Sequence, residues 1–107
     1  MPLPLAAQSD RPPTFFLRTL GYSRVILSDP AGYCHPFARE EGGNTCRVDR
    51  GTPTRIEVGK SEYQYCMYSA NTLPGTDKIE IHLVTVNNFN CQLKPTSLNM
   101  FEVYEKK

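Results

Sequence analysis

The chain has 107 residues, with 12 basic and 11 acidic side chains and a formal net charge of +1. This length suits one domain, and so small a net charge gives no electrostatic signature of binding to nucleic acid or to an anionic membrane. No apolar run approaches the ~20 residues that a membrane-spanning helix needs. We therefore expect one small domain whose partner is neither a nucleic acid nor a membrane.

Four cysteines, Cys34, Cys46, Cys66 and Cys91, are the strongest signal in the chain. Their number is even, no Cys-x-x-Cys pair occurs, and no Cys/His cluster has the spacing of metal ligands, which favours disulfides over zinc or thiol redox chemistry. A domain of this size buries only roughly 65% of its unfolded surface, so cross-links add needed stability. We predict two disulfides, no metal, no cofactor and a secreted protein whose signal peptide has been removed.

The first third of the chain is predicted to be an arm followed by short strands. Residues 1–13 hold four of the nine prolines and form a flexible Pro-rich arm, which leaves residues 14–107 as a single β-domain. Phe15–Leu20 and Arg24–Ser28 are β-rich on either side of Gly21, as in a hairpin. Tyr33–Arg39 reads as a short strand that ends at the Gly-containing segment 40–44.

The clearest hairpin signal lies between Thr54–Val58 and Glu62–Ser69, which flank a Gly-Lys-Ser turn. After a Pro-Gly turn, apolar residues alternate with polar ones from position 78 to position 83, and Met100–Glu105 forms a last strand. No segment shows sustained helical spacing. The sequence therefore predicts an all-β fold, a small disulfide-braced antiparallel β-sandwich of about six strands with an extended N-terminal arm.

The two histidines suggest an enzymatic alternative. His35 follows a cysteine and His82 lies on the polar side of its predicted strand, so with Arg55 and Glu57 they would supply the acid and base of a small secreted ribonuclease. A solvated role is the commoner one for isolated histidines, and no catalytic motif accompanies them. We expect a non-enzymatic protein.

Aromatic and charged residues of the 54–68 hairpin indicate a binding surface. Tyrosine, arginine and exposed strand edges contribute much of the energy of protein interfaces, although paired tyrosines also fill small β cores. The predicted partner-binding residues are Arg55, Glu57, Lys60, Glu62 and Tyr63. A proteinase inhibitor that presents the braced loop 35–45 is a further alternative, because constrained loops lose little entropy on binding.

The half of the chain from Cys66 onwards resembles the MAX family of secreted fungal effectors, which comprises the ToxB-like and avirulence proteins of plant pathogens. The similarity lies in three segments: Lys78–Leu83, Asn88–Leu93 and the aromatic last strand Met100–Lys107. The Arg55–Ser61 segment also resembles the family's central strand and turn.

The resemblance implies a virulence function without catalysis, in which the protein is secreted, enters or contacts a host and binds a host plant protein such as a small heavy-metal-associated-type domain. It also implies a six-strand sandwich in which one disulfide joins the first strand to the loop before the fifth. Cys46 with Cys91 has that separation, and Cys34 takes the place of Cys46 if Tyr33–Arg39 is the first strand. Pairing in sequence order, Cys34 with Cys46 and Cys66 with Cys91, suits the hairpins equally well, because four cysteines allow three connectivities.

Overall fold

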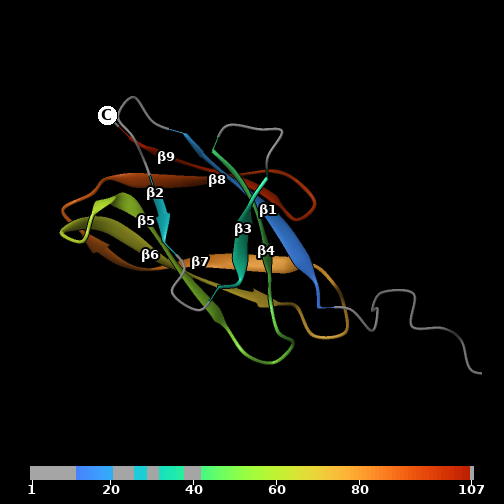
Figure 1. Cartoon of the computed structure of the whole chain (residues 1–107). Coiled ribbons are helices and arrows are strands. Elements are labelled where there is room, and N and C mark those ends of the chain that lie inside the picture. The colour runs from blue at the N-terminus through green and yellow to red at the C-terminus, as the bar shows by residue number, and fades with distance from the viewer. Residues whose placement is uncertain (1–11, 21–25, 29–31, 38–41, 107) are drawn as a thin grey trace, which may run out of the picture.

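The computed structural model describes residues 12–20, 26–28, 32–37 and 42–106, and these fold as two packed β-sheets without a helix (Figure 1). The predicted all-β sandwich with two disulfides is therefore confirmed. The described residues form nine strands rather than about six, and β4 and β8 are the two that lie outside the predicted strand segments. Of the predicted arm, residues 1–11 lie outside the described part of the chain.

One sheet has five strands in the order β3-β4-β1-β9-β8. Their bounds are Cys34–Pro36 for β3, Gly43–Arg47 for β4, Thr14–Leu20 for β1, Met100–Glu105 for β9 and Cys91–Ser97 for β8. β1 is the central strand, and it runs parallel to β9, where residue Phe16 lies opposite Met100. Every other pairing in both sheets is antiparallel.

The second sheet has four strands in the order β2-β5-β6-β7. Their bounds are Ile26–Ser28 for β2, Thr54–Ser61 for β5, Gln64–Thr72 for β6 and Ile79–Asn87 for β7. The three longer strands form a meander, in which each strand pairs with the next along the chain.

The predicted hairpin around Gly21 is wrong. β1 and β2 belong to different sheets, because β1 pairs with β4 and β9 whereas β2 pairs with β5. The chain thus crosses from one sheet to the other between them, and residues 21–25 lie outside the described part. The physical reason is that the β pattern of residues 15–20 specifies a strand but not its partners, which are β4 and the distant β9.

Two strands, β4 and β8, were not predicted because their sequences are mostly polar. In β4 only Gly43 and Cys46 are buried, and the strand starts within the segment that was expected to be a turn. β8 contains Pro95, which a strand tolerates at a sheet edge, and its register with β9 shifts just after this proline. Pairing with stronger neighbours makes these segments strands despite weak local patterns.

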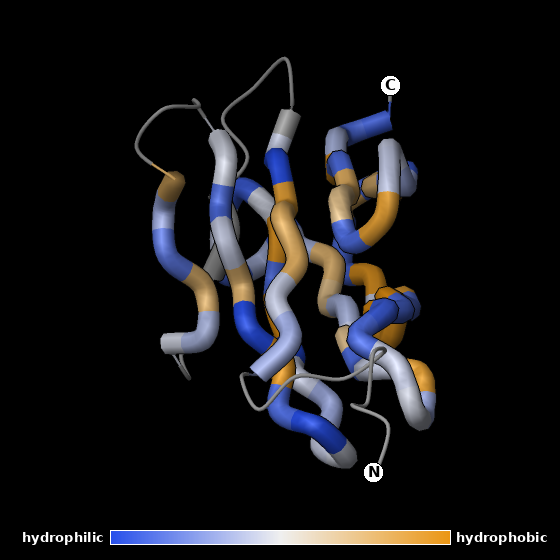
Figure 2. The backbone as a smooth tube through the Cα atoms, turned by 90° about the vertical axis from the view of Figure 1, so that its right-hand side faces the viewer, coloured by the Kyte–Doolittle hydropathy of each residue, from blue (hydrophilic) through white to orange (hydrophobic). Residues whose placement is uncertain are grey.

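A single core fills the space between the two sheets, and its largest fully buried side chains come from both of them, including Phe15, Leu17, Ile56, Val58 and Val103. Apolar and polar stretches alternate along the strands (Figure 2), which is the pattern of a sheet with one buried face. Phe15 and Phe101 meet edge to face, with ring centroids 6.0 Å apart.

The disulfides join Cys34 to Cys46 and Cys66 to Cys91. The pairing of Cys46 with Cys91 that the family resemblance implied is therefore wrong for this structure, and so is its variant with Cys34. The first bond lies within the five-stranded sheet, where its two cysteines are opposite each other on β3 and β4. The second joins β6 to β8 and so links the two sheets covalently.

Asn99 links strands of the two sheets by hydrogen bonds at one end of the sandwich. Its side-chain oxygen accepts a hydrogen bond from the Ile79 N–H at 2.8 Å, and its side-chain nitrogen donates to the Asp77 carbonyl at 2.8 Å. Its own carbonyl accepts from the Phe16 N–H at 2.8 Å. One residue in the turn between β8 and β9 therefore holds the start of β7 and the central strand β1 together.

Candidate functional site

The predicted 54–68 hairpin exists, but it lies mostly inside its sheet. β5 is flanked by β2 over Glu57, Val58 and Gly59, and β6 is flanked along its length by β7. The reversal falls at residues 62 and 63 rather than at 59–61, because β5 continues to Ser61. The outermost described strands of the four-stranded sheet are therefore β2 and β7, although β2 covers only three of the eight residues of β5.

The five predicted partner-binding residues lie in three different settings. Arg55 and Glu57 project from the outer face of β5, since the alternate residues Thr54, Ile56 and Val58 are buried. Glu62 and Tyr63 form the turn, and the Tyr63 side chain is exposed at the tip. The five side chains therefore follow one hairpin without forming one compact cluster.

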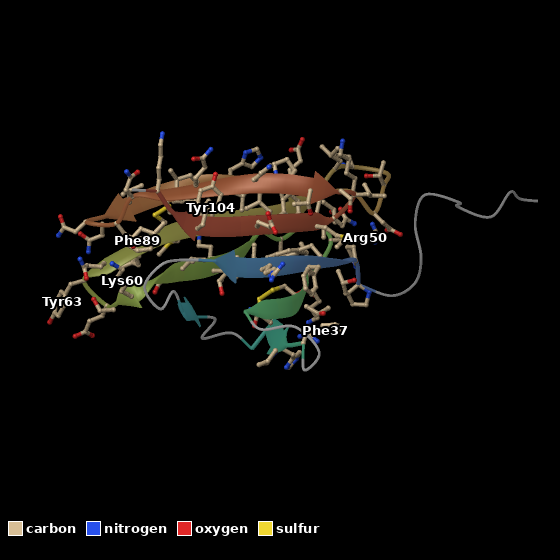
Figure 3. All side chains as sticks on the ribbon, turned by 90° about the horizontal axis from the view of Figure 1, so that it is seen from above. Phe37, Arg50, Lys60, Tyr63, Phe89 and Tyr104 are labelled. Atoms are coloured by element: carbon tan, nitrogen blue, oxygen red, sulfur yellow. A yellow bond between two sulfur atoms is a disulfide. The ribbon has the colours of Figure 1, made fainter. Side chains whose placement is uncertain are left out.

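Lys60 has a structural contact that the sequence did not indicate. Its Nζ atom lies 2.9 Å from the Glu105 carboxylate on β9, so this ion pair joins the two sheets. Lys60 and Tyr63 lie at one end of the molecule, and Arg50 lies at the other (Figure 3). At that far end Arg50 bonds to Asp77 and to the Thr76 carbonyl.

The two histidines are not brought together. His35 lies on β3, an outer strand of the five-stranded sheet, where it is opposite Thr45. His82 lies on β7, an outer strand of the other sheet, where its Nε2 atom is 3.4 Å from the Glu80 carboxylate. The ribonuclease arrangement of His35, His82, Arg55 and Glu57 needs both imidazoles at one site, which this geometry does not supply.

The braced loop 35–45 is described only at its two ends, because residues 38–41 lie outside the described part of the chain. The Phe37 N–H donates to the Gly43 carbonyl at 2.8 Å, and the Cys34–Cys46 disulfide closes the same region. Pro36 and Phe37 are exposed.

The most exposed apolar feature among the strands is the outer strand β7. Leu83, Val84 and Val86 are exposed by 51%, 46% and 52%, although the first and last lie opposite the buried residues Tyr68 and Cys66 of β6. Residues opposite each other on paired strands share a face, so Leu83 and Val86 point to the core side and yet remain half uncovered. No described strand pairs with the outer edge of β7.

A bulge interrupts the pairing of β7 with β6. The register with β6 shifts between Met67 and Tyr68, and Val84 has no partner residue there. Ile79 is buried and Ile81 packs against the core, whereas the apolar residues at the bulge and on either side of it, Leu83, Val84 and Val86, do not join the core. The exposed apolar side chains of β7 therefore cluster around the bulge.

The strand next to this exposed edge, β6, is bonded to the other sheet. Tyr68, opposite Leu83, is buried, and its hydroxyl donates to the Cys91 sulfur at 3.1 Å. Burial raises the pKa of Tyr68 to about 12. Next to it the disulfide from Cys66 to Cys91 links β6 to the other sheet, so the strand that carries β7 cannot move freely.

The sequence missed Val84 and Val86 because the alternation that defined this strand was followed only to Leu83. The β-branched run Val84-Thr85-Val86 favours an extended strand, and it was the signal that the strand continues.

No group of three or more potential metal ligands occurs among the described residues. In the same residues there is no helix long and apolar enough to cross a membrane. Comparison of the chain with protein-family models, with curated proteins and with solved structures finds no match.

Proposed function

We propose that this chain is a secreted, non-enzymatic binding protein that recognises a partner protein by adding a strand of that partner to the outer edge of β7. The observation that carries the proposal is the half-exposed row Leu83, Val84 and Val86 on an outer strand. Two disulfides in a chain of 107 residues are compatible with secretion.

Strand addition combines two sources of affinity at such an edge. The unpaired backbone N–H and C=O groups hydrogen bond with any extended chain, and the side chains beside them select the sequence. A strand paired with β7 would cover Leu83 and Val86 with its own core-facing residues. The edge strands of β-sheets are normally protected by charged residues or proline. An exposed apolar edge strand therefore indicates a site where another protein binds.

The resemblance to the MAX effectors suggests the class of partner. It implies a plant host protein such as a heavy-metal-associated-type domain, and hence a virulence function for the protein outside the cell that makes it. The hairpin residues Arg55, Glu62 and Tyr63 are the competing location for the same interface, because their side chains are exposed on the same sheet.

Binding to purified plant heavy-metal-associated-type domains, measured by titration calorimetry, tests the partner. The double variant Leu83→Lys and Val86→Lys tests the edge, and the double reversal Arg55→Glu and Lys60→Glu is the comparison at the hairpin. We expect the β7 variant to weaken binding by about tenfold or more and the hairpin variant to change it little.

The opposite ranking of the two variants would assign the interface to the hairpin. Binding that both folded variants retain would contradict the β7 proposal. Failure of the unmodified protein to bind any of these domains would exclude the partner class that the resemblance implies.

A further inference from the structure

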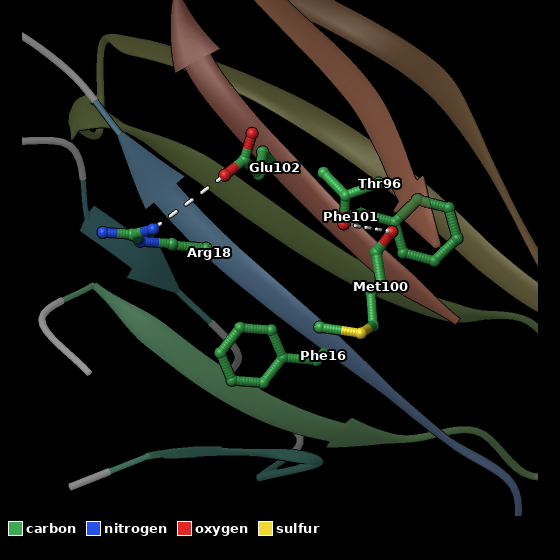
Figure 4. Close-up of a pocket in the computed structure, with 6 residues that line it drawn as sticks. All are labelled: Phe16, Arg18, Thr96, Met100, Phe101 and Glu102. Carbon is green, nitrogen blue, oxygen red and sulfur yellow. Dashed lines mark hydrogen bonds and ion pairs between the residues drawn. The ribbon is translucent and has the colours of Figure 1, made fainter. Parts of the chain in front are cut away.

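A cleft of about 160 Å³ lies on the outer face of the five-stranded sheet (Figure 4). Its lining residues are Phe16, Arg18, Thr96, Met100, Phe101 and Glu102. They come from β1, β8 and β9, the three neighbouring strands on that side of the sheet.

The apolar walls of the cleft are held in place by their neighbours. Phe37 meets Phe16 edge to face, with ring centroids 5.7 Å apart and the planes at 87°. The Ser97 hydroxyl donates to the Met100 sulfur at 2.9 Å, and Thr96 donates to the Met100 carbonyl at 3.3 Å. Phe37 and Met100 nevertheless remain exposed by 41% and 42%. The walls are therefore preformed, apolar and accessible.

The volume sets the size of the group that the cleft accepts. An apolar cavity of roughly 150 Å³ accommodates a benzene molecule. A cleft of about 160 Å³ therefore suits one aromatic or branched aliphatic side chain and no larger apolar ligand. Flexible thioethers such as that of Met100 make favourable contacts with aromatic rings.

The charges around the cleft are mostly positive. Alternation along the strands directs Arg18, Arg47 and Lys94 to this outer face, and Glu102 is the acidic side chain between Arg18 and Lys94 in the strand register. The Arg18 guanidinium approaches the Glu102 carboxylate only to 4.0 Å, and Lys94 forms no ion pair within the part of the chain that the structure describes. Both cations can therefore accept a further carboxylate.

We propose that this face binds an acidic, extended peptide segment of a partner protein. One apolar side chain of the segment occupies the cleft between Phe16 and Met100, and flanking carboxylates pair with Arg18 and Lys94. This site is independent of the β7 edge, so the chain carries two surfaces on opposite sheets.

Two other occupants fit the face less well. Single-stranded nucleic acid stacks its bases on open ring faces, but the Phe16 ring is already engaged by Phe37. A second copy would set the cations of one face against those of another, and like charges at an interface oppose association. An acidic peptide satisfies both the apolar cleft and the charge.

The probe is a short acetylated peptide, Gly-Glu-Asp-Phe-Glu-Asp-Gly, titrated into the isotope-labelled protein while its NMR spectrum is recorded. We expect saturable shifts at residues 16–18 and 94–102, including the Met100 methyl group, and weaker binding at higher salt because exposed charges are screened. Peptides with Gly in place of Phe, or with Lys in place of every acid, are expected to bind about tenfold more weakly or not at all.

The double variant Arg18→Gln and Lys94→Gln is expected to bind the acidic peptide about tenfold more weakly. It keeps its fold, because exposed substitutions usually change stability within about 0.5 kcal/mol. Arg55→Gln, on the outer face of the other sheet, is the matched control and leaves binding unchanged.

Absence of saturable shifts, or shifts confined to β7, would overturn the proposal. Tighter binding of a short oligothymidylate at the same residues would reassign the face to nucleic acid. A concentration-dependent doubling of mass in sedimentation, with the same residues affected and no peptide present, would reassign it to a second copy of the chain.

Discussion

Replacing Cys66 and Cys91 together with Ala removes the covalent link between the two sheets. In the chain-entropy model, a bond that spans 25 residues stabilises the fold by about 3.5 kcal/mol, and the Cys34–Cys46 bond, which spans 12 residues, by about 2.8 kcal/mol. The first replacement also takes away the acceptor of the buried Tyr68 hydroxyl, which costs about 1 kcal/mol more.

The two double variants should therefore differ clearly. We expect a loss of about 4–5 kcal/mol for the Cys66/Cys91 pair and about 3 kcal/mol for the Cys34/Cys46 pair, a gap of several degrees in Tm for a domain of this size. Urea unfolding of both variants and of the parent protein, followed by circular dichroism, measures the difference. If a variant does not fold in buffer, its Tm is measured in a stabilising osmolyte and is compared with the Tm of the other two proteins in the same solution.

Two results would contradict this expected difference in stability. The first is a larger loss for the Cys34/Cys46 pair, since the link between sheets would then matter less than the link between neighbouring strands. The second is a non-reduced peptide map of the parent protein in which Cys46 is joined to Cys91, as the family resemblance implied, instead of to Cys34.

Gly59→Ala should destabilise the protein by about 3 kcal/mol in urea unfolding, because the new Cβ atom would lie 2.1 Å from the Gln64 carbonyl oxygen. A loss of less than about 1 kcal/mol would contradict this close approach. Asn99→Ala should cost about 2 kcal/mol by the same measurement through two lost hydrogen bonds, whereas a near-neutral effect would show that Asn99 does not fasten the sheets. Absorbance titration should reveal a tyrosine that ionises near pH 12 and disappears in Tyr68→Phe. Because the pKa of Tyr68 is raised by folding, its contribution to stability is complete below about pH 10 and is lost as the pH rises to about 12; a flat stability profile over this range would contradict the assignment.

The parts of the fold that the sequence predicted correctly are those with a strong local pattern. The β-rich segments 54–58 and 62–69 around a Gly-containing turn predict the β5–β6 hairpin, and the even cysteine count predicts two disulfides. The partners of β1 could not be predicted, because its pairing with β9 joins residues far apart in the chain and leaves no local signal.

The candidate sites show the same division between local and long-range information. The local pattern predicted the hairpin that carries Tyr63 but placed its turn at 59–61 instead of 62–63, and which strand forms the outer edge depends on the order of all strands in the sheet. The cleft between Phe16 and Met100 could not be predicted from the sequence for the same reason. Its two walls come from opposite ends of the chain and meet only through the parallel pairing.

The pairing of β1 with β9 also has a consequence for the order of folding. Phe16 lies opposite Met100, so the central strand of the five-stranded sheet lacks one neighbour until residues 100–105 have been synthesised. Contacts between such distant residues carry a large loop-closure entropy and slow the folding of β proteins. The local meander of β5, β6 and β7 has no such requirement and can form earlier. The nascent chain is therefore expected to form the β5–β6–β7 meander before the five-stranded sheet closes.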